Sequence, residues 1–165
     1  MGPVIGATLL RLRQQAEAFQ LSADARRLLE WVFRSATVTG MCGAARAKEA
    51  GPAFGVPQTT LASRLARAGL PSVRSMLVAV RMILAADLRE AGYSMGSAAD
   101  WLGYSSLSAL NRAARSVCGM PRQAFASLPQ ATRDKLFTDH LAAHPSWSSV
   151  RLAPPQPPRG AEGEG

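Results

Sequence analysis

The strongest constraint on the fold is a helical pattern of apolar residues between positions 73 and 92. Its large aliphatic side chains recur three or four residues apart, at Val73, Met76, Leu77, Val80, Ile83, Leu84 and Leu88. This spacing places them on one face of an α-helix. About 20 residues predict a helix roughly 30 Å long, for which Ser72 is a suitable N-cap.

Glycine and proline divide the rest of the chain into shorter helical segments. We expect helices over 4–20, over 23–35 with Ser22 as N-cap, over 58–68, 95–102 and 106–118, and beyond Pro129 with Leu136, Phe137 and Leu141 on one side. The segment 40–51 also permits a helix, which Gly51 and Pro52 should stop. Apolar residues make up 47% of the 165 residues but aromatic residues only 6%, which favours packed helices. The sequence predicts an all-α protein.

Two pairs of short helices flank the long helix, and each pair is joined by a tight turn. The first joins 41–50 to 58–68 across Gly55, and the second joins 95–102 to 106–118 across Gly103. Two short helices joined in this way form a helix-turn-helix. The expected organisation is an N-terminal helical extension (1–21), a first helix-turn-helix subdomain (22–70), a linker helix (73–92), a second helix-turn-helix subdomain (94–128), a C-terminal helix (129–145) and a disordered tail (146–165).

Positive charge is concentrated in the region that holds both pairs. The chain has 19 Lys and Arg against 11 Asp and Glu, a net charge of +8 at pH 7. Residues 22–128 hold 13 basic and 6 acidic side chains, which leaves +7 in that region. All basic residues except Lys48 and Lys135 are arginine, which suits phosphates and guanine edges, although a codon bias would give the same ratio. The charge indicates a polyanionic partner, with nucleic acid first.

A spaced motif runs through the second pair of helices. It comprises Met95, Ala99, Gly103, Tyr104, Ser108, Arg112, Arg115 and Gly119. These residues and their spacing resemble the second helix-turn-helix of the AraC-type transcription regulators, and the resemblance extends back over about residues 22–128. It implies a sequence-specific regulator that reads two adjacent major grooves of double-stranded DNA, with RNA polymerase as a further candidate partner.

In such a module, the N-terminal residues of each recognition helix face base edges while neighbouring basic groups hold phosphates. The resemblance assigns this role to Gln58, Thr59, Ala62, Ser63 and Arg64 in the first helix and to Ser106, Leu107, Ala109, Arg112 and Arg115 in the second. Arg112 is the best candidate for a base or phosphate contact, and the alternative is an arginine on a solvated helix face. Pro52 falls inside the expected scaffold helix of the first unit, which leaves base reading by that unit open.

The length of the long helix bears on stoichiometry. Roughly 30 Å is close to the roughly 34 Å between successive major grooves on one face of DNA. We therefore expect one chain to bind DNA as a monomer. Only about 21 residues precede the module, so the chain is either a regulator without a sensor domain or the DNA-binding part of a longer reading frame.

Other functions have less support in the sequence. No nucleophile is paired with a base, so an enzyme is not expected, and a degenerate helix-turn-helix acting as a protein-interaction domain is the alternative. His140 and His144 have the spacing of zinc ligands but lack a third ligand, so no metal or other cofactor is expected. Cys42 and Cys118 predict no disulfide, which fits a reducing cytoplasm. Charges such as Arg81 interrupt the apolar runs, so no membrane helix is expected.

Overall fold

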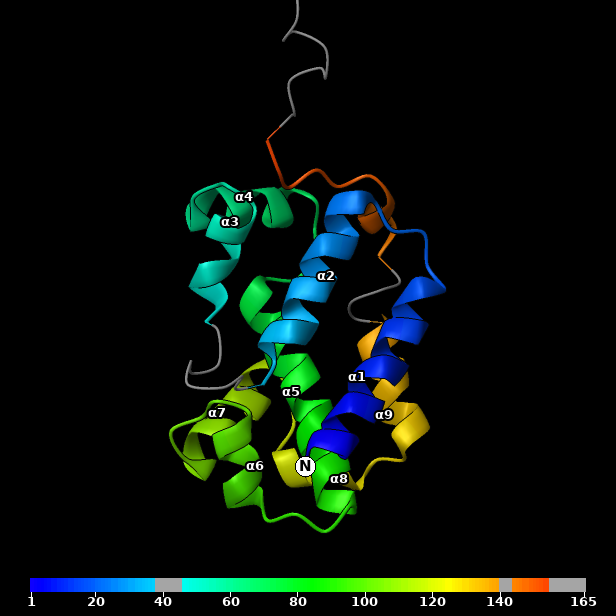
Figure 1. The fold of residues 1–165 in the computed structure, drawn as a ribbon, viewed down its shortest axis with the longest axis vertical. Helices are drawn as coiled ribbons and strands as arrows, with labels where there is room; N and C mark the ends of the chain where they lie inside the picture. Colours follow the sequence, from blue (N-terminus) through cyan, green and yellow to red (C-terminus); the bar gives the residue numbers. More distant parts are fainter. Residues whose placement is uncertain (38–45, 140–143, 155–165) are drawn as a thin grey trace, which may run out of the picture.

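A computed structural model describes residues 1–37, 46–139 and 144–154, which are helical and contain no β-strand. The predicted all-α fold is therefore confirmed for the described residues. In chain order the elements are α1 (Gly2–Glu17), α2 (Ala23–Ser35), the 3-10 turn η1 (Ala47–Glu49), α3 (Ala50–Ala53), α4 (Gln58–Arg67), α5 (Val73–Glu90), α6 (Met95–Trp101), α7 (Leu107–Cys118), α8 (Arg122–Ser127), α9 (Gln130–Phe137) and the 3-10 turn η3 (Pro145–Ser148) (Figure 1).

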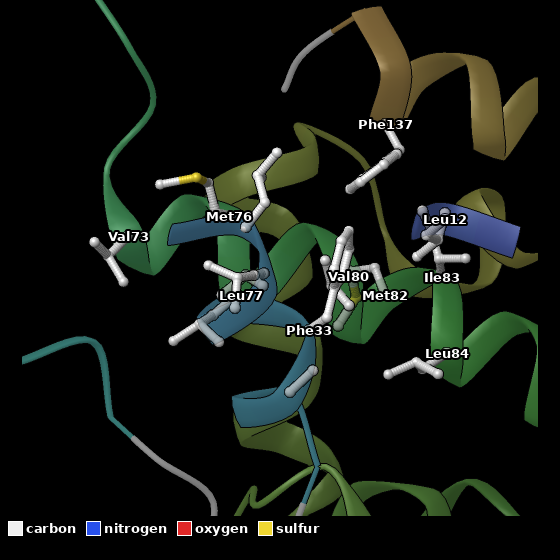
Figure 2. Packing of buried hydrophobic residues seen from close by; sticks show 14 of the residues in the cluster. Leu12, Phe33, Val73, Met76, Leu77, Val80, Met82, Ile83, Leu84 and Phe137 are labelled. Carbon is white, nitrogen blue, oxygen red and sulfur yellow. The ribbon is translucent and has the colours of Figure 1, made fainter. Parts of the chain in front are cut away.

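The central element is α5, which contacts α1, α2, α6, α7, α8 and α9. Twelve of its 18 residues are buried, so the helix is enclosed on most sides. Figure 2 shows Leu12 of α1, Phe33 of α2 and Phe137 of α9 gathered around the side chains of α5. The rings of Phe33 and Phe137 lie 6.1 Å apart at an angle of 42°. One cluster of buried side chains runs through α5, so the division into two subdomains stays a prediction.

Local signals set the ends of the helices where the sequence places them. The hydroxyl oxygens of Ser22 and Ser72 accept hydrogen bonds from the backbone N–H groups three residues later, as predicted. Ser106 does the same for α7, which begins one residue after the expected start. At the other end of α7, Gly119 adopts a φ of +67°, a left-handed conformation that other residues rarely adopt.

Buried charges connect α1, α5 and α9. The Asp87 carboxylate of α5 accepts hydrogen bonds from the Thr8 hydroxyl at 2.6 Å, from Arg11 at 2.7 Å and from Arg133 at 3.0 Å. Arg11 also donates to Asp134 of α9 at 2.7 Å. We call these five residues the Asp87 cluster. It fixes the N-terminal helix to the central helix, because each carboxylate is shared between elements that lie far apart in the sequence.

The predicted disordered tail is wrong for residues 146–154. Trp147 and Leu152 are fully buried, and Val150 is nearly so. The Asp24 carboxylate, in the first turn of α2, accepts hydrogen bonds from the backbone N–H groups of Leu152 and Ala153 at 2.6 and 3.0 Å. Trp147 lies in the short 3-10 turn η3, and Val150 and Leu152 follow it outside any helix, so these apolar residues give no periodic signal and the pattern missed them. Residues 155–165 lie outside the described part of the chain.

Two smaller expectations are also corrected. Gly51 and Pro52 do not stop a helix but lie inside α3, where proline is tolerated because the N–H groups of a first turn have no partner within the helix. On α9, Phe137 is buried as expected but Leu136 is 42% exposed. The segment 38–45 and Leu141 lie outside the described residues.

Candidate nucleic-acid interface

The second helix-turn-helix unit consists of α6, a turn through Gly103 and α7. Gly103 has a φ of +79°, and the backbone N–H of Tyr104 donates to the carbonyl of Ala99 at 2.9 Å. Ala98, Ala99 and Leu110 are buried where the two helices meet. Small side chains therefore suffice to pack this unit, and they let α6 and α7 approach closely.

The exposed face of α7 carries the residues expected to contact DNA. Leu107, Ser108, Arg112 and Arg115 are exposed, and the last three follow one another at helical spacing. Arg112 and Arg115 form no ion pair with another described residue. Unpaired guanidinium groups along one helix face form an electropositive strip that suits a phosphate backbone.

Two other predicted residues of α7 are less available. The side-chain oxygen of Ser106 caps the helix by accepting from the backbone N–H of Ala109 at 3.1 Å. Ala109 itself is only partly exposed. Ser106 and Ala109 therefore belong to the N-terminal turn of α7, beside the exposed residues Leu107 and Ser108.

Tyr104 fixes the second unit to α5. Its ring is largely buried, with the Arg81 guanidinium carbon 5.6 Å from the ring centre. Burial raises the pKa of the Tyr104 phenol, although the positive charge of Arg81 opposes this effect. The uncharged ring therefore belongs to the packing of the unit.

The first helix-turn-helix unit consists of α3, a turn through Gly55 and α4. The side-chain oxygen of Gln58, at the start of α4, accepts a hydrogen bond from the backbone N–H of Gly51 at 2.7 Å. A Cβ atom at Gly51 would lie 2.6 Å from the Cα of Gln58, so only glycine allows this approach of α3 to α4. The predicted DNA contact Gln58 therefore has a structural partner and is half-buried.

Along α4 the predicted residues divide between two faces. Thr59, Ala62 and Ser63 are exposed, while Arg64 is half-buried and donates a hydrogen bond to the carbonyl of Leu152. Sequence reasoning missed Arg67, an exposed arginine four residues after Ser63 on the same side of the helix. That spacing could have identified it. The exposed face of α4 thus carries two hydroxyl groups and one arginine.

A second basic surface lies between α2 and α3. Arg26, Arg27 and Arg34 line a hollow of about 340 Å³ together with Trp31 and Phe54. The Arg27 guanidinium carbon stands 4.7 Å from the centre of the Phe54 ring. Glu30 also lines the hollow and neutralises part of its charge. The sequence predicted α2 correctly, but the pairing of its outer face with α3 depends on tertiary structure.

Figure 1 shows where the two helix pairs lie relative to α5. In that view α3 and α4 lie toward the upper end of the long axis and α6 and α7 toward the lower end, both on the left. Helices α1 and α9 lie on the opposite side of α5. Helices α4 and α7 therefore lie toward opposite ends of the long axis in this view.

Metal binding, membrane crossing and cysteine reactivity find little support in the described residues. They contain no group of three or more His, Cys, Asp or Glu side chains that could hold a metal ion, and none of their helices is long and apolar enough to cross a membrane. Burial raises the pKa of the Cys118 thiol, which keeps it protonated and poorly nucleophilic. Cys42 and His140 lie outside the described residues.

No protein-family model, curated protein or solved structure matches this chain.

Proposed function

We propose that the chain is a sequence-specific DNA-binding transcription regulator that contacts the major groove through α7. The observation that carries the proposal is the exposed face of α7, where Ser108, Arg112 and Arg115 follow at helical spacing on the second helix of a helix-turn-helix. Arginine can donate two parallel hydrogen bonds to guanine or to a phosphate, and serine can donate to either. The resemblance to the AraC-type regulators gives the same helix this role.

The first unit would make a weaker contribution under this proposal. Its exposed face has Arg67 as its only described arginine, because Arg64 is bound to the carbonyl of Leu152. Thr59 and Ser63 can still hydrogen-bond to bases or phosphates. We expect α4 to add affinity and some sequence preference, and α7 to dominate both.

The proposed stoichiometry on DNA is one chain per site. The 18 residues of α5 span roughly 27 Å, close to the roughly 34 Å between successive major grooves on one face of DNA. The apolar face of α1, the helix most available for a dimer, is already buried through Ile5, Leu9 and Leu12. Sedimentation with a duplex of about 20 base pairs should show one chain per duplex. A complex of two chains would contradict this part of the proposal.

Salt-dependent binding provides the main test. The affinity of the purified protein for a labelled duplex of random sequence should fall steeply with salt, because each phosphate contact releases counterions. The double variant Arg112→Ala/Arg115→Ala should bind more weakly, and its log–log salt slope should be smaller by up to about 2. The Lys135→Ala variant is the control, since Lys135 is exposed on α9, away from both units.

The outcomes separate DNA binding from a protein-interaction role. Absence of binding to any duplex at low salt would contradict the proposal and favour the protein-interaction alternative, for which the exposed Trp101 and Leu107 offer apolar contacts. Equal losses for the α7 double variant and Lys135→Ala would contradict the assignment of α7. Arg112, Arg115 and Lys135 are all exposed, so unchanged melting temperatures of the variants would confirm that a folding defect does not cause the loss of binding.

A further inference from the structure

The hollow between α2 and α3 combines concave shape, positive charge and an aromatic wall. It measures about 340 Å³, and its lining includes Arg26, Arg27, Glu30, Trp31, Arg34 and Phe54. Sites for small molecules are concave and usually measure roughly 300–1,000 Å³. The walls belong to α2 and α3, so the hollow is separate from the face of α7 that the proposed function uses.

The guanidinium groups of the hollow are accessible to a ligand. The side chains of Arg27 and Arg34 are 55% and 70% exposed, and Arg26 is exposed as well. Their ion pairs are long, at 3.9 Å from Arg27 to Asp24 and 3.8 Å from Arg34 to Glu30. Arg26 forms no ion pair with another described residue. An anion that enters the hollow can therefore reach several N–H donors without displacing a short ion pair.

The hollow has an excess of positive charge. Its three arginines face one carboxylate, that of Glu30. This carboxylate already accepts two hydrogen bonds from the Arg13 guanidinium of α1, at 2.9 and 3.0 Å. Glu30 therefore balances Arg13 more closely than it balances the arginines of the hollow. The remaining field attracts an anionic group.

Trp31 provides a surface for an aromatic ring. It is half-buried and lies four residues after Arg27 and three residues before Arg34, so all three share one face of α2. The two arginines are roughly 10 Å apart along the helix axis, with the indole between them. Phe54 is 4% exposed, with the Arg27 guanidinium carbon 4.7 Å from its ring centre, so its ring positions Arg27 and leaves Trp31 for the ligand.

We propose that this hollow binds a small aromatic anion, which is a planar ring that carries one carboxylate or phosphate group. The ring packs against Trp31, and the anionic group accepts hydrogen bonds from the arginines within one helical turn on either side. The backbone of duplex DNA has phosphates but no free ring, because its bases are stacked inside the helix. The proposal does not rest on DNA binding, since it uses no residue of α7.

An NMR titration of the tryptophan indole N–H signals tests the proposal directly. The chain has three tryptophans, whose signals can be assigned with Trp→Phe variants. Trp31 should respond in a saturable way to benzoate or to phenyl phosphate, and the tighter ligand identifies the preferred anionic group. Trp101, which is 44% exposed on α6, and the fully buried Trp147 are internal controls and should not respond.

Two further probes separate the ring from the charge. Benzyl alcohol has the ring without the charge, and acetate has the charge without the ring. Each should bind at least about tenfold more weakly than benzoate, because a hydrogen bond to a charged group and an aromatic contact each contribute on the order of a factor of ten.

Variants of the hollow complete the test. Arg34→Gln should weaken benzoate binding by about tenfold, whereas Arg74→Gln, at an exposed position of α5 outside the hollow, should leave it unchanged. Glu30→Gln removes the carboxylate and should strengthen benzoate binding, a result that a loss of structure would not produce.

Several results would overturn the proposal. One is a Trp31 signal that neither benzoate nor phenyl phosphate changes, and another is benzyl alcohol or acetate that binds as tightly as benzoate. Equal benzoate affinities of the Arg34→Gln and Arg74→Gln proteins would also contradict it. If no aromatic anion binds and Arg34→Gln instead weakens the binding of a DNA duplex, the hollow is a contact for the DNA backbone and the proposal is wrong.

Discussion

Replacing Asp87 with asparagine should destabilise the protein far more than an equivalent change on the surface. The Asp87 side chain is 7% exposed and accepts from Thr8, Arg11 and Arg133, with donor distances of 2.6 to 3.0 Å. Asn has nearly the same shape, so no cavity forms. It removes the charge that balances Arg133 and turns an NH₂ group toward atoms that are themselves donors.

The expected cost follows from the burial of these partners. Breaking a buried ion pair costs about 3–5 kcal/mol. Arg11 keeps Asp134 and Arg133 keeps Glu90, so we expect a loss near the lower end, about 3 kcal/mol. For a chain of this size, that loss lowers the melting temperature by roughly 6–12 °C.

The control is an ion pair with similar geometry but greater exposure. Arg13 and Glu30 are paired at 2.9 Å, and their side chains are 33% and 43% exposed. Glu30→Gln should therefore cost only about 0.2–1 kcal/mol. Urea unfolding followed by circular dichroism measures both variants. Equal losses, or an Asp87→Asn protein as stable as the parent, would refute the view that the Asp87 cluster fixes α1 and α9 to α5.

Three further changes test other parts of the fold. Gly51→Ala should destabilise the first unit because the added Cβ meets backbone at 2.6 Å, whereas Gly96→Ala in α6 meets nothing within 4 Å and should be neutral or stabilising in thermal melts. Trp147→Ala should cost about 3–5 kcal/mol in urea unfolding, and an unchanged midpoint would show that the C-terminal segment does not pack. In a Tyr93→Phe protein, absorbance at 295 nm should show Tyr104 titrating above its ordinary pKa. Stability should then fall as the pH rises above about 10, because the unfolded chain loses the phenol proton before the folded chain does. A Tyr104 phenol that titrates at its ordinary pKa would contradict the burial of the ring.

Much of the helical framework could be predicted because its signals are local. The apolar spacing of α5 and the serine caps at Ser22 and Ser72 depend only on neighbouring residues. The same holds for the glycine that ends α7. The exposed face of α7 could be identified for this reason, since it is the complement of its buried face.

The parts that could not be predicted depend on partners far away in the sequence. Nothing near Arg133 indicates that its partner is Asp87, 46 positions earlier. Arg64 and Gln58 read as surface polar residues until the C-terminal segment and α3 are placed beside them. A sequence pattern assigns every polar side chain of a helix to its exposed face. Only the tertiary structure shows which of these side chains form hydrogen bonds with the backbone of a distant segment.

Selection of bound sequences from a pool of randomised duplexes tests the central claim most directly. If α7 and α4 read adjacent major grooves, the enriched sequences should share two short elements about 10 base pairs apart, with the stronger element lost in the Arg112→Ala protein. Each mismatch in that element should cost about 1–3 kcal/mol. Repeated rounds that enrich no common sequence, or a motif that Arg112→Ala leaves intact, would contradict the account of α7 as a base-reading helix.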